Sequence, residues 1–336
     1  MKNILINGIK WTLIAALLVV VYFWRRDIID EALIKIAHMP IWVTVLSVSL
    51  AILYFVFEGK VISGMTVLEE KPMRWIDGFR CAFFCAFYRL ITLGAGAGIS
   101  EAYFYSKSGF HYTKALGMTL VQYTFHKIVL GALGLISFIL LLLLGQSGIV
   151  TYAPYMALGT AAITAIVTFL IILSVSKKLA DFLVFLIEKL LTEKMPFYKK
   201  KDEFILNVRA FNNEGREIWK HKEIFVSAII LNLLKFISWN VIPGIVFMSE
   251  GRVNLIVCIA IMSVVSMVSS VMVAPSGIGT LEFLFVLLFT TIVSNETAAA
   301  AVIVYRFFTW IFPFFIGAII AGLFKGKEKA EAEKTA

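Results

Sequence analysis

Seven ionisable residues lie within or beside strongly apolar stretches of this chain, where they could bind a charged solute. They are Arg89, Glu101, His126, Lys127, Lys235, Glu282 and Arg306. A charged side chain at the bilayer centre costs at least ~2.5–3.5 kcal/mol, so each of them needs a partner or a function. Four bases and two acids leave two positive charges in excess when both carboxylates are ionised. We therefore expect a water-filled, mildly cationic cavity that suits an anionic headgroup.

Glu101 and Glu282 follow similar glycine-rich breaks. The first break runs Gly94-Ala-Gly96-Ala-Gly98-Ile-Ser-Glu101, and the second runs Pro275-Ser-Gly277-Ile-Gly279-Thr-Leu-Glu282. Both contain the pattern G-x-G-x-x-E between apolar half-segments. Glycine adopts turn conformations that other residues avoid, and proline removes a helical hydrogen bond. The sequence therefore predicts a broken helix at each site.

Two roles are open for these glutamates. Ser100 and Thr280 are predicted to cap the half-helices that follow, and the helix dipole stabilises a carboxylate in the first turn. Alternatively, each glutamate pairs with one of the four bases and gates access or carries a coupled proton. Helix N-termini attract phosphate, but a glutamate there would repel it, so a phosphate is expected at the bases.

Lys235 is the most central of the bases, in the middle of an apolar stretch. Asn232, Lys235 and Trp239 share one helical face by their spacing. A lysine in this place cannot easily extend its ammonium group to the interface. It therefore either binds substrate or forms a structural pair with a glutamate.

The remaining bases differ in their setting. Arg306 follows Tyr305 in an apolar segment, and we place both residues at the substrate site together with Lys127. Arg89 lies close to the first break, where it is expected to neutralise the glutamate. His126 is more typical of a hydrogen-bonded interior histidine than of a proton carrier.

The composition excludes a soluble enzyme, a disordered protein and a nucleic-acid-binding module. Of the 336 residues, 60% are hydrophobic and only 16% are charged, whereas soluble domains have about 45–50% and 25%. The net charge is +9, but the bases lie in short loops, which indicates an anionic membrane surface as partner. Three cysteines exclude a disulfide framework and a closed metal site. No nucleotide, metal or nucleophile motif is present, so we expect no cofactor and no catalysis.

The apolar stretches predict an all-α polytopic membrane protein, because a span needs about 20 such residues. Seven spans are expected, the first of them uncleaved: 11–24, 41–57, 115–144, 155–175, 224–248, 253–273 and 298–323. Two shorter stretches, 81–93 and 281–292, each adjoin a break. Broken helices are tolerated at membrane depth only where protein or a wet cavity covers their backbone.

The distribution of Lys and Arg sets the orientation. Segment 176–222 carries 11 of them and the tail 324–336 carries four, whereas loops 145–154 and 293–297 carry none. We place the first two in the cytoplasm of a cell-membrane protein; only loop 25–40 conflicts. Segment 176–222 is expected to be a connector whose residues 178–192 lie at the interface. Its lysines form either a solvated surface or a site for anionic headgroups.

This orientation makes the first broken element enter from the cytoplasm and the second from outside. Within one membrane domain, 1–336, we therefore expect two inverted-topology repeats, about 41–144 and 224–323. In such proteins, discontinuous helices frame a substrate site near the bilayer midplane. The alternative is that both breaks are kinks for close packing.

The second break resembles a known family. Residues 275–283 are similar to the P-G-G-x-G-x-x-E/D element of the lysylphosphatidylglycerol synthase transmembrane region. Tyr305-Arg306 is similar to the family's arginine-bearing helix, and residues 98–102 to its first-half G-x-x-E stretch. Ser276, Gly94 and Gln122-Tyr123 depart from the family pattern.

This resemblance implies a lipid flippase that handles anionic or aminoacylated phospholipid such as lysyl-phosphatidylglycerol, with a role in resistance to cationic peptides. The soluble domain that transfers lysine in the full-length factor is expected to be absent, so the chain is not expected to be an enzyme. Alternatives are a secondary transporter of a small anion or amino acid, and a non-transporting partner of a lipid synthase or glycosyltransferase. A homo-oligomer is also open.

Overall fold

The computed structural model describes residues 34 and 39–335, apart from 93, 95, 146, 194, 196, 197, 250, 252 and 273–277. Throughout this part of the chain the regular secondary structure is helical, without strands. The predicted all-α fold class is thereby confirmed. The predicted span 11–24, most of loop 25–40, Pro275 and Gly277 lie outside the described residues.

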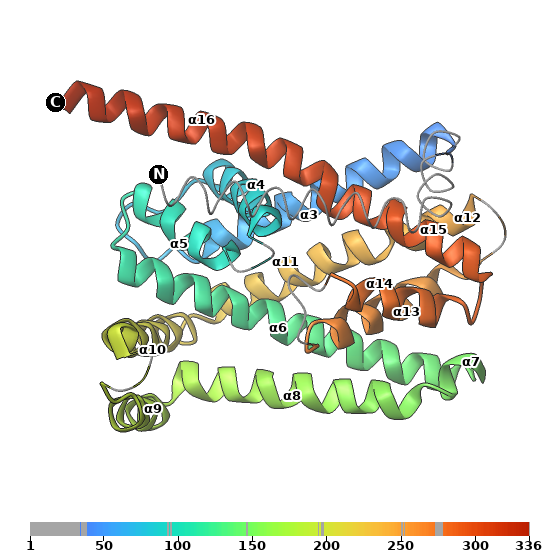
Figure 1. The fold of residues 1–336 in the computed structure, drawn as a ribbon, viewed down its shortest axis with the longest axis horizontal. Coiled ribbons are helices and arrows are strands. Elements are labelled where there is room, and N and C mark those ends of the chain that lie inside the picture. The colour runs from blue at the N-terminus through green and yellow to red at the C-terminus, as the bar shows by residue number, and fades with distance from the viewer. Residues whose placement is uncertain are drawn as a thin grey trace.

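Five described helices or helix pairs are long and apolar enough to cross a membrane. They are α3 (Ile41–Gly64), α6 (Tyr112–Leu143), α8 (Ala153–Val175), α11 with α12 (Lys222–Met248), and α15 with α16 (Asn295–Lys325). They run lengthwise through the molecule (Figure 1). In place of the predicted span 253–273, the structure has α13 (Leu255–Ser269), with only 15 residues. The count of seven spans stays a prediction.

The last of these pairs contains two different helical geometries. α15 (Asn295–Arg306) is followed by a π-helical turn, Phe307–Ile311, before α16 (Phe312–Thr335) begins. π-helical turns are rare and occur mostly as single turns inside α-helices. Arg306 thus lies directly before a widened turn.

The first broken element consists of α4 (Trp75–Ile91) and α5 (Ala97–Lys107). Gly94 between them has a φ of 93°, a conformation that L side chains rarely adopt. The open end of the pair lies where α3 ends and α6 begins. There, the Tyr105 hydroxyl donates a 2.7 Å hydrogen bond to the Ile62 carbonyl.

The second broken element consists of α13 and α14 (Thr280–Phe289). Gly279 before α14 also has a positive φ, 86°. The far end of α14 packs against α7 (Ser147–Val150), which follows the C-terminal end of α6: a Cβ on Gly148 would lie 2.8 Å from the Thr291 side chain. The two broken elements therefore enter from opposite ends of α6, as Figure 1 shows. The repeat relation between the halves stays a prediction.

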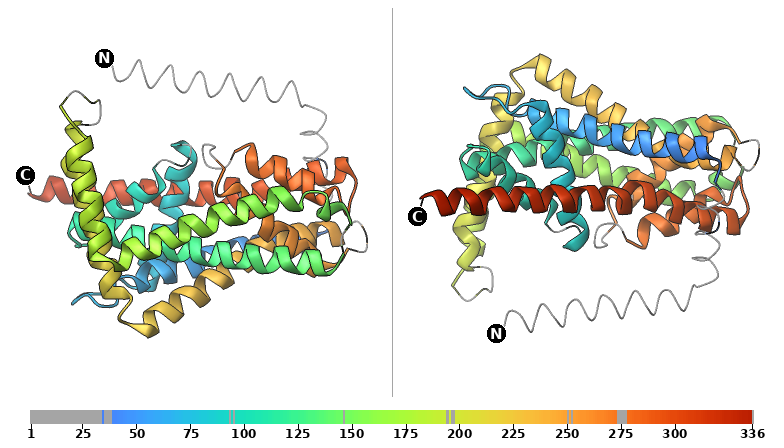
Figure 2. Two further views of the ribbon diagram at one scale, coloured as in Figure 1. Left: turned by 90° about the horizontal axis from the view of Figure 1, so that it is seen from below. Right: turned by 90° about the horizontal axis from the view of Figure 1, so that it is seen from above.

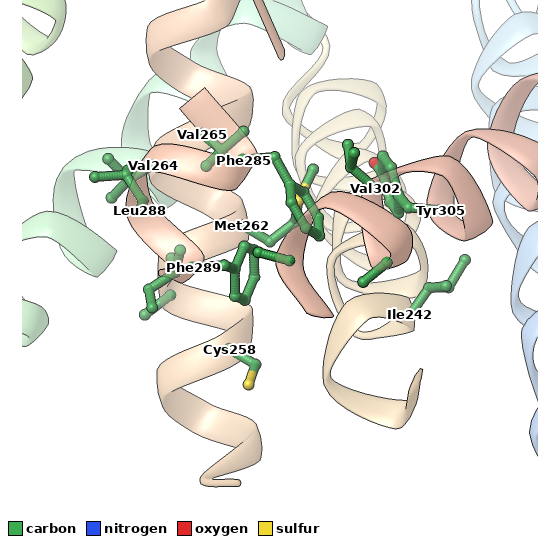
Figure 3. Packing of buried hydrophobic residues seen from close by; sticks show 14 of the residues in the cluster. Ile242, Cys258, Met262, Val264, Val265, Phe285, Leu288, Phe289, Val302 and Tyr305 are labelled. Carbon is green, nitrogen blue, oxygen red and sulfur yellow. The ribbon is translucent and has the colours of Figure 1, made fainter. Parts of the chain in front are cut away.

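Two large hydrophobic clusters hold the described helices together, one around α13 and α14 and one around α4 and α5. In the second half, Phe285 and Phe289 of α14 pack between α13 and the helices that carry Ile242 and Val302 (Figure 3). The two phenylalanine rings lie 4.3 Å apart. Because lipid tails are as apolar as these side chains, van der Waals packing holds such helices together more than transfer from water does.

The connector 176–222 forms helices that cross one end of the molecule. α9 (Lys177–Leu190) and α10 (Lys201–Ile218) run across the direction of α6 and α8, as Figures 1 and 2 show. α10 packs on α6 and α8, where the Asn212 amide donates a 2.7 Å hydrogen bond to the Leu173 carbonyl. α9 leaves Phe182 and Phe185 exposed. α9 thus covers nearly the same residues as the stretch 178–192 that was predicted to lie at the membrane interface.

Candidate functional site

A cavity of about 540 Å³ lies between the two broken elements. Gly94 and Gly98 line it from the first break, and Leu281 and Arg306 line it from the second element and the helix after it. Helices α3, α4, α6 and α11 complete its walls, and Tyr54 and Trp239 are stacked there with ring centroids 3.5 Å apart. Both breaks therefore contribute to one cavity.

A buried ion pair lies in the wall of this cavity. The Lys235 ammonium group, with 0% of its side chain exposed, lies 2.5 Å from Oε2 of Glu58 on α3. It also lies 3.1 Å from Nδ1 of His126. An ammonium group only donates, so Nδ1 must accept, and the histidine is a neutral partner in this arrangement. Lys235 does pair with a glutamate, but the partner is Glu58 rather than Glu101 or Glu282.

Glu58 was not among the predicted site residues. The predicted span ended at residue 57, because Glu58 and Lys60 resemble the start of a loop. The structure instead continues α3 to Gly64. The helical spacing from Ala51, Tyr54 and Phe55, all buried, was the signal that could have placed Glu58 on the interior face.

Glu101 lies beside this pair. The Gln122 amide nitrogen is 3.4 Å from Oε2 of Glu101 and 3.5 Å from Oε1 of Glu58, so it bridges both carboxylates. Of the ion pairs between described residues, none links Glu101 to Arg89. The expectation that Arg89 neutralises Glu101 was therefore wrong, although both residues line the cavity.

Glu282 and Arg306 form the ion pair of the second element. Nε of Arg306 lies 2.7 Å from Oε1 of Glu282, and the guanidinium group stacks 4.2 Å from the centroid of the Trp310 ring. The second carboxylate oxygen accepts a 2.8 Å hydrogen bond from the Gly279 amide. Glu282 thus both caps α14 and pairs with a base, whereas a gating or proton-carrying role stays a prediction.

The predicted capping residues were wrong. α5 begins at Ala97 after Gly96, and the Ser100 hydroxyl donates to the Ala97 carbonyl within the helix. α14 is preceded by Gly279, so Thr280 is its first helical residue. The glycines already provide the turn conformations, and each helix begins one or more residues before the position that its hydroxyl residue predicts.

Two predicted site residues, Lys127 and Asn232, lie close to the cavity but do not line it. Lys127 donates a 3.0 Å hydrogen bond to the carbonyl of Ser270, directly after α13. This contact satisfies a carbonyl at a helix C-terminus, where a positive charge is favourable. Asn232 is fully buried and donates to the Ala228 carbonyl in its own helix. Tyr305, in contrast, lines the cavity directly.

The charge balance differs from the predicted one because Glu58 adds a third acid. Lys235 and Arg306 are matched by Glu58 and Glu282, and Lys127 is held by a backbone carbonyl. Among the described cavity residues, Arg89 and Glu101 are left as ionisable groups outside any ion pair. The cavity therefore contains acidic as well as basic groups, rather than only the excess of bases that was predicted.

Comparison with known proteins gives one family. The model of the family described as the lysylphosphatidylglycerol synthase TM region matches residues 9–317. No curated protein matches the chain. The match covers both broken elements and every helix that lines the cavity.

Proposed function

The chain belongs to the lysylphosphatidylglycerol synthase TM region family, and from this premise we propose that it moves phospholipid across a membrane. The observation that carries this proposal is the cavity that both broken helices line. A lipid headgroup needs a polar path through the bilayer, whereas its acyl chains can stay in the hydrocarbon. A volume of about 540 Å³ falls within the ~300–1,000 Å³ typical of sites for small ligands.

Arg89 is the proposed contact for the lipid phosphate. Arginine binds phosphate with two parallel hydrogen bonds, and Arg89 is the cavity guanidinium group that has no carboxylate partner within the described structure. Arg306 faces the same cavity with its charge shared by Glu282. Lys235 is better suited to a structural role, because Glu58 and His126 already occupy its ammonium group.

The opposite entry of the two broken elements supports alternation between the two sides of the membrane. We propose that the halves 41–144 and 224–323 are inverted-topology repeats that open the cavity in turn to each leaflet. The basic segment 176–222 and the C-terminus would then lie on the cytoplasmic side of the cell membrane, with α9 on its anionic surface. Transport of anionic or aminoacylated phospholipid would contribute to lipid homeostasis and to resistance against cationic peptides.

Reconstitution tests this proposal. Protein in liposomes with a fluorescent phosphatidylglycerol should expose the lipid of the inner leaflet to an external quencher faster than protein-free liposomes. The Arg89→Gln variant should be slower by roughly 10- to 100-fold, because a charge-assisted hydrogen bond contributes about 1.5–3 kcal/mol. The matched control is Arg74→Gln, which removes an exposed, ion-paired arginine at the start of the same helix, 2.9 Å from Asp77.

The outcomes separate the proposed function from its alternatives. Equal rates for wild type, Arg89→Gln and protein-free liposomes would refute lipid movement. If a proton gradient instead drives uptake of a water-soluble anion or amino acid, a secondary transporter is favoured. Stable co-purification with a lipid-modifying enzyme, without lipid movement, would favour a non-transporting partner.

A further inference from the structure

Glu101 has an incomplete set of partners although it is buried. Its residue is 8% exposed and lines the cavity. Within the described structure, Oε1 of Glu101 and the buried hydroxyl of Thr119 from α6 lack a well-aligned hydrogen-bond partner, and Thr119 is the hydroxyl that acts on this carboxylate. Its other oxygen has only the long contact to the Gln122 amide, 3.4 Å. Buried polar atoms are nearly always hydrogen-bonded, so this exception indicates a missing binding partner.

The charges around Glu101 do not supply that partner. The titratable and charged groups near it are Glu58 of α3, Cys81, Cys85 and Arg89 of α4, Tyr105 of α5, His126 of α6 and Lys235 of α11. Lys235 is already bound to Glu58 and His126. Glu58 adds a second negative charge, which Gln122 connects to the first. Arg89 lines the same cavity but forms no ion pair with Glu101 in the described structure. An ionised Glu101 would therefore be a buried carboxylate without a base at ion-pair distance, which is strongly unfavourable.

We propose that Glu101 is a proton-binding site and that its proton is exchanged for a cationic group of the lipid that enters the cavity. The inference rests on the proposed function. When an ammonium group approaches, the O–H bond of Glu101 breaks, the proton leaves through the cavity water to bulk solvent, and the ammonium group balances the carboxylate. The charge inside the cavity stays the same, so each cationic lipid that enters releases one proton.

The other carboxylates cannot serve as this site in the arrangement described. Oε2 of Glu58 is bound by Lys235, and Glu282 is bound by Arg306 and by the Gly279 amide. A proton on either would break an ion pair. A proton on Glu101 adds a donor where the structure has two unsatisfied oxygens, those of Glu101 and Thr119.

Infrared spectroscopy of the purified protein tests the proton site itself. The spectrum should contain the carbonyl band of a buried protonated carboxyl at neutral pH. Glu101→Gln should remove this band, and Asp181→Asn, at an exposed position of α9, should retain it. Glu101→Gln should also melt within a few degrees of the wild type, because glutamine resembles the protonated acid. A band that persists in Glu101→Gln overturns the proton site.

Lipid addition tests the exchange. In weakly buffered detergent with a pH indicator, lysyl-phosphatidylglycerol should release about one proton per protein bound. Phosphatidylglycerol, which lacks the lysyl group, should bind without release, and Glu101→Gln should release none. Lysyl-phosphatidylglycerol that binds without proton release overturns the exchange. If neither lipid binds, the proposed function fails together with the exchange, whereas the infrared band alone then decides whether Glu101 holds a proton.

Discussion

The buried pair of Glu58 and Lys235 allows a quantitative test of the site. In Glu58→Gln, the Lys235 ammonium group, 0% exposed and 2.5 Å from the replaced oxygen, would lose its counter-charge. Breaking a buried pair from one side costs about 3–5 kcal/mol. The carbonyl oxygen of the introduced glutamine and Nδ1 of His126 can still accept hydrogen bonds from the ammonium group. We therefore expect a loss near the lower limit, about 3 kcal/mol.

The double variant Glu58→Gln/Lys235→Met removes both charges and should recover most of this stability. Replacement of a whole buried pair by residues of similar volume is often neutral or stabilising. The double-mutant cycle should therefore give a coupling energy of about 2–3 kcal/mol. The measurement is reversible unfolding of the four proteins in mixed micelles, followed by helical circular dichroism.

A more exposed ion pair is the matched control for this cycle. Lys114 lies 2.6 Å from Glu69, with 40% and 19% of the two side chains exposed. Its cycle should give no more than about 1 kcal/mol, as exposed pairs generally do. A coupling energy for Glu58 and Lys235 that is no larger than this control, or a double variant as unstable as the sum of the singles, would refute the assignment of a buried, mutually dependent pair.

Two further predictions concern packing and pH. A Cβ on Gly59 would lie 2.5 Å from backbone atoms of Phe79, so Gly59→Ala should lower the free energy of unfolding by about 1–3 kcal/mol. The control is Gly64→Ala, where a Cβ would meet nothing within 4 Å and the free energy of unfolding should change little. Equal melting temperatures of the two variants would contradict this close approach of α3 and α4. In α10, burial raises the pKa of Glu214 to about 7, with Glu69 and Glu217 adding to the effect and Lys114 opposing it. The raised pKa means that ionisation of Glu214 destabilises the folded state. This loss of stability is absent well below the pKa of the unfolded chain, grows as the pH rises towards 7, and is complete above pH 7. Glu214→Gln should therefore melt above the wild type at about pH 8 but not at about pH 4, and a difference independent of pH would contradict the assignment.

The sequence was sufficient for those features that depend on local composition. The apolar stretches predicted the helical class, and the glycine-rich sequences predicted the two breaks, where Gly94 and Gly279 indeed have a positive φ. Four of the sparse charges inside apolar stretches line the cavity, namely Arg89, Glu101, His126 and Arg306, and their role in substrate binding stays a prediction. These signals are strong because a charged side chain inside the bilayer costs free energy unless a partner or a water-filled cavity stabilises it.

The pairing of those charges could not be predicted in the same way. Lys235 had two candidate carboxylates, Glu101 and Glu282, and its actual partner Glu58 is 177 residues away in the sequence. Lys127 has the charge of a substrate contact but binds a backbone carbonyl directly after α13, which no pattern of side chains can reveal. Contacts across helices depend on their relative rotation, and a shift of one residue turns a side chain by about 100°.

Because contacts between helices depend on rotation, the π-helical turn after Arg306 has a consequence for the site. Such a turn accommodates one residue more than an α-turn, so a helix can absorb or release that residue there without unfolding. Its absorption into an α-turn would rotate α15 by about 100° relative to α16 and withdraw the Arg306 guanidinium group from Glu282, which holds the start of α14. A one-residue shift of the helix in the cavity wall would thus change the contacts that hold the N-terminal end of α14.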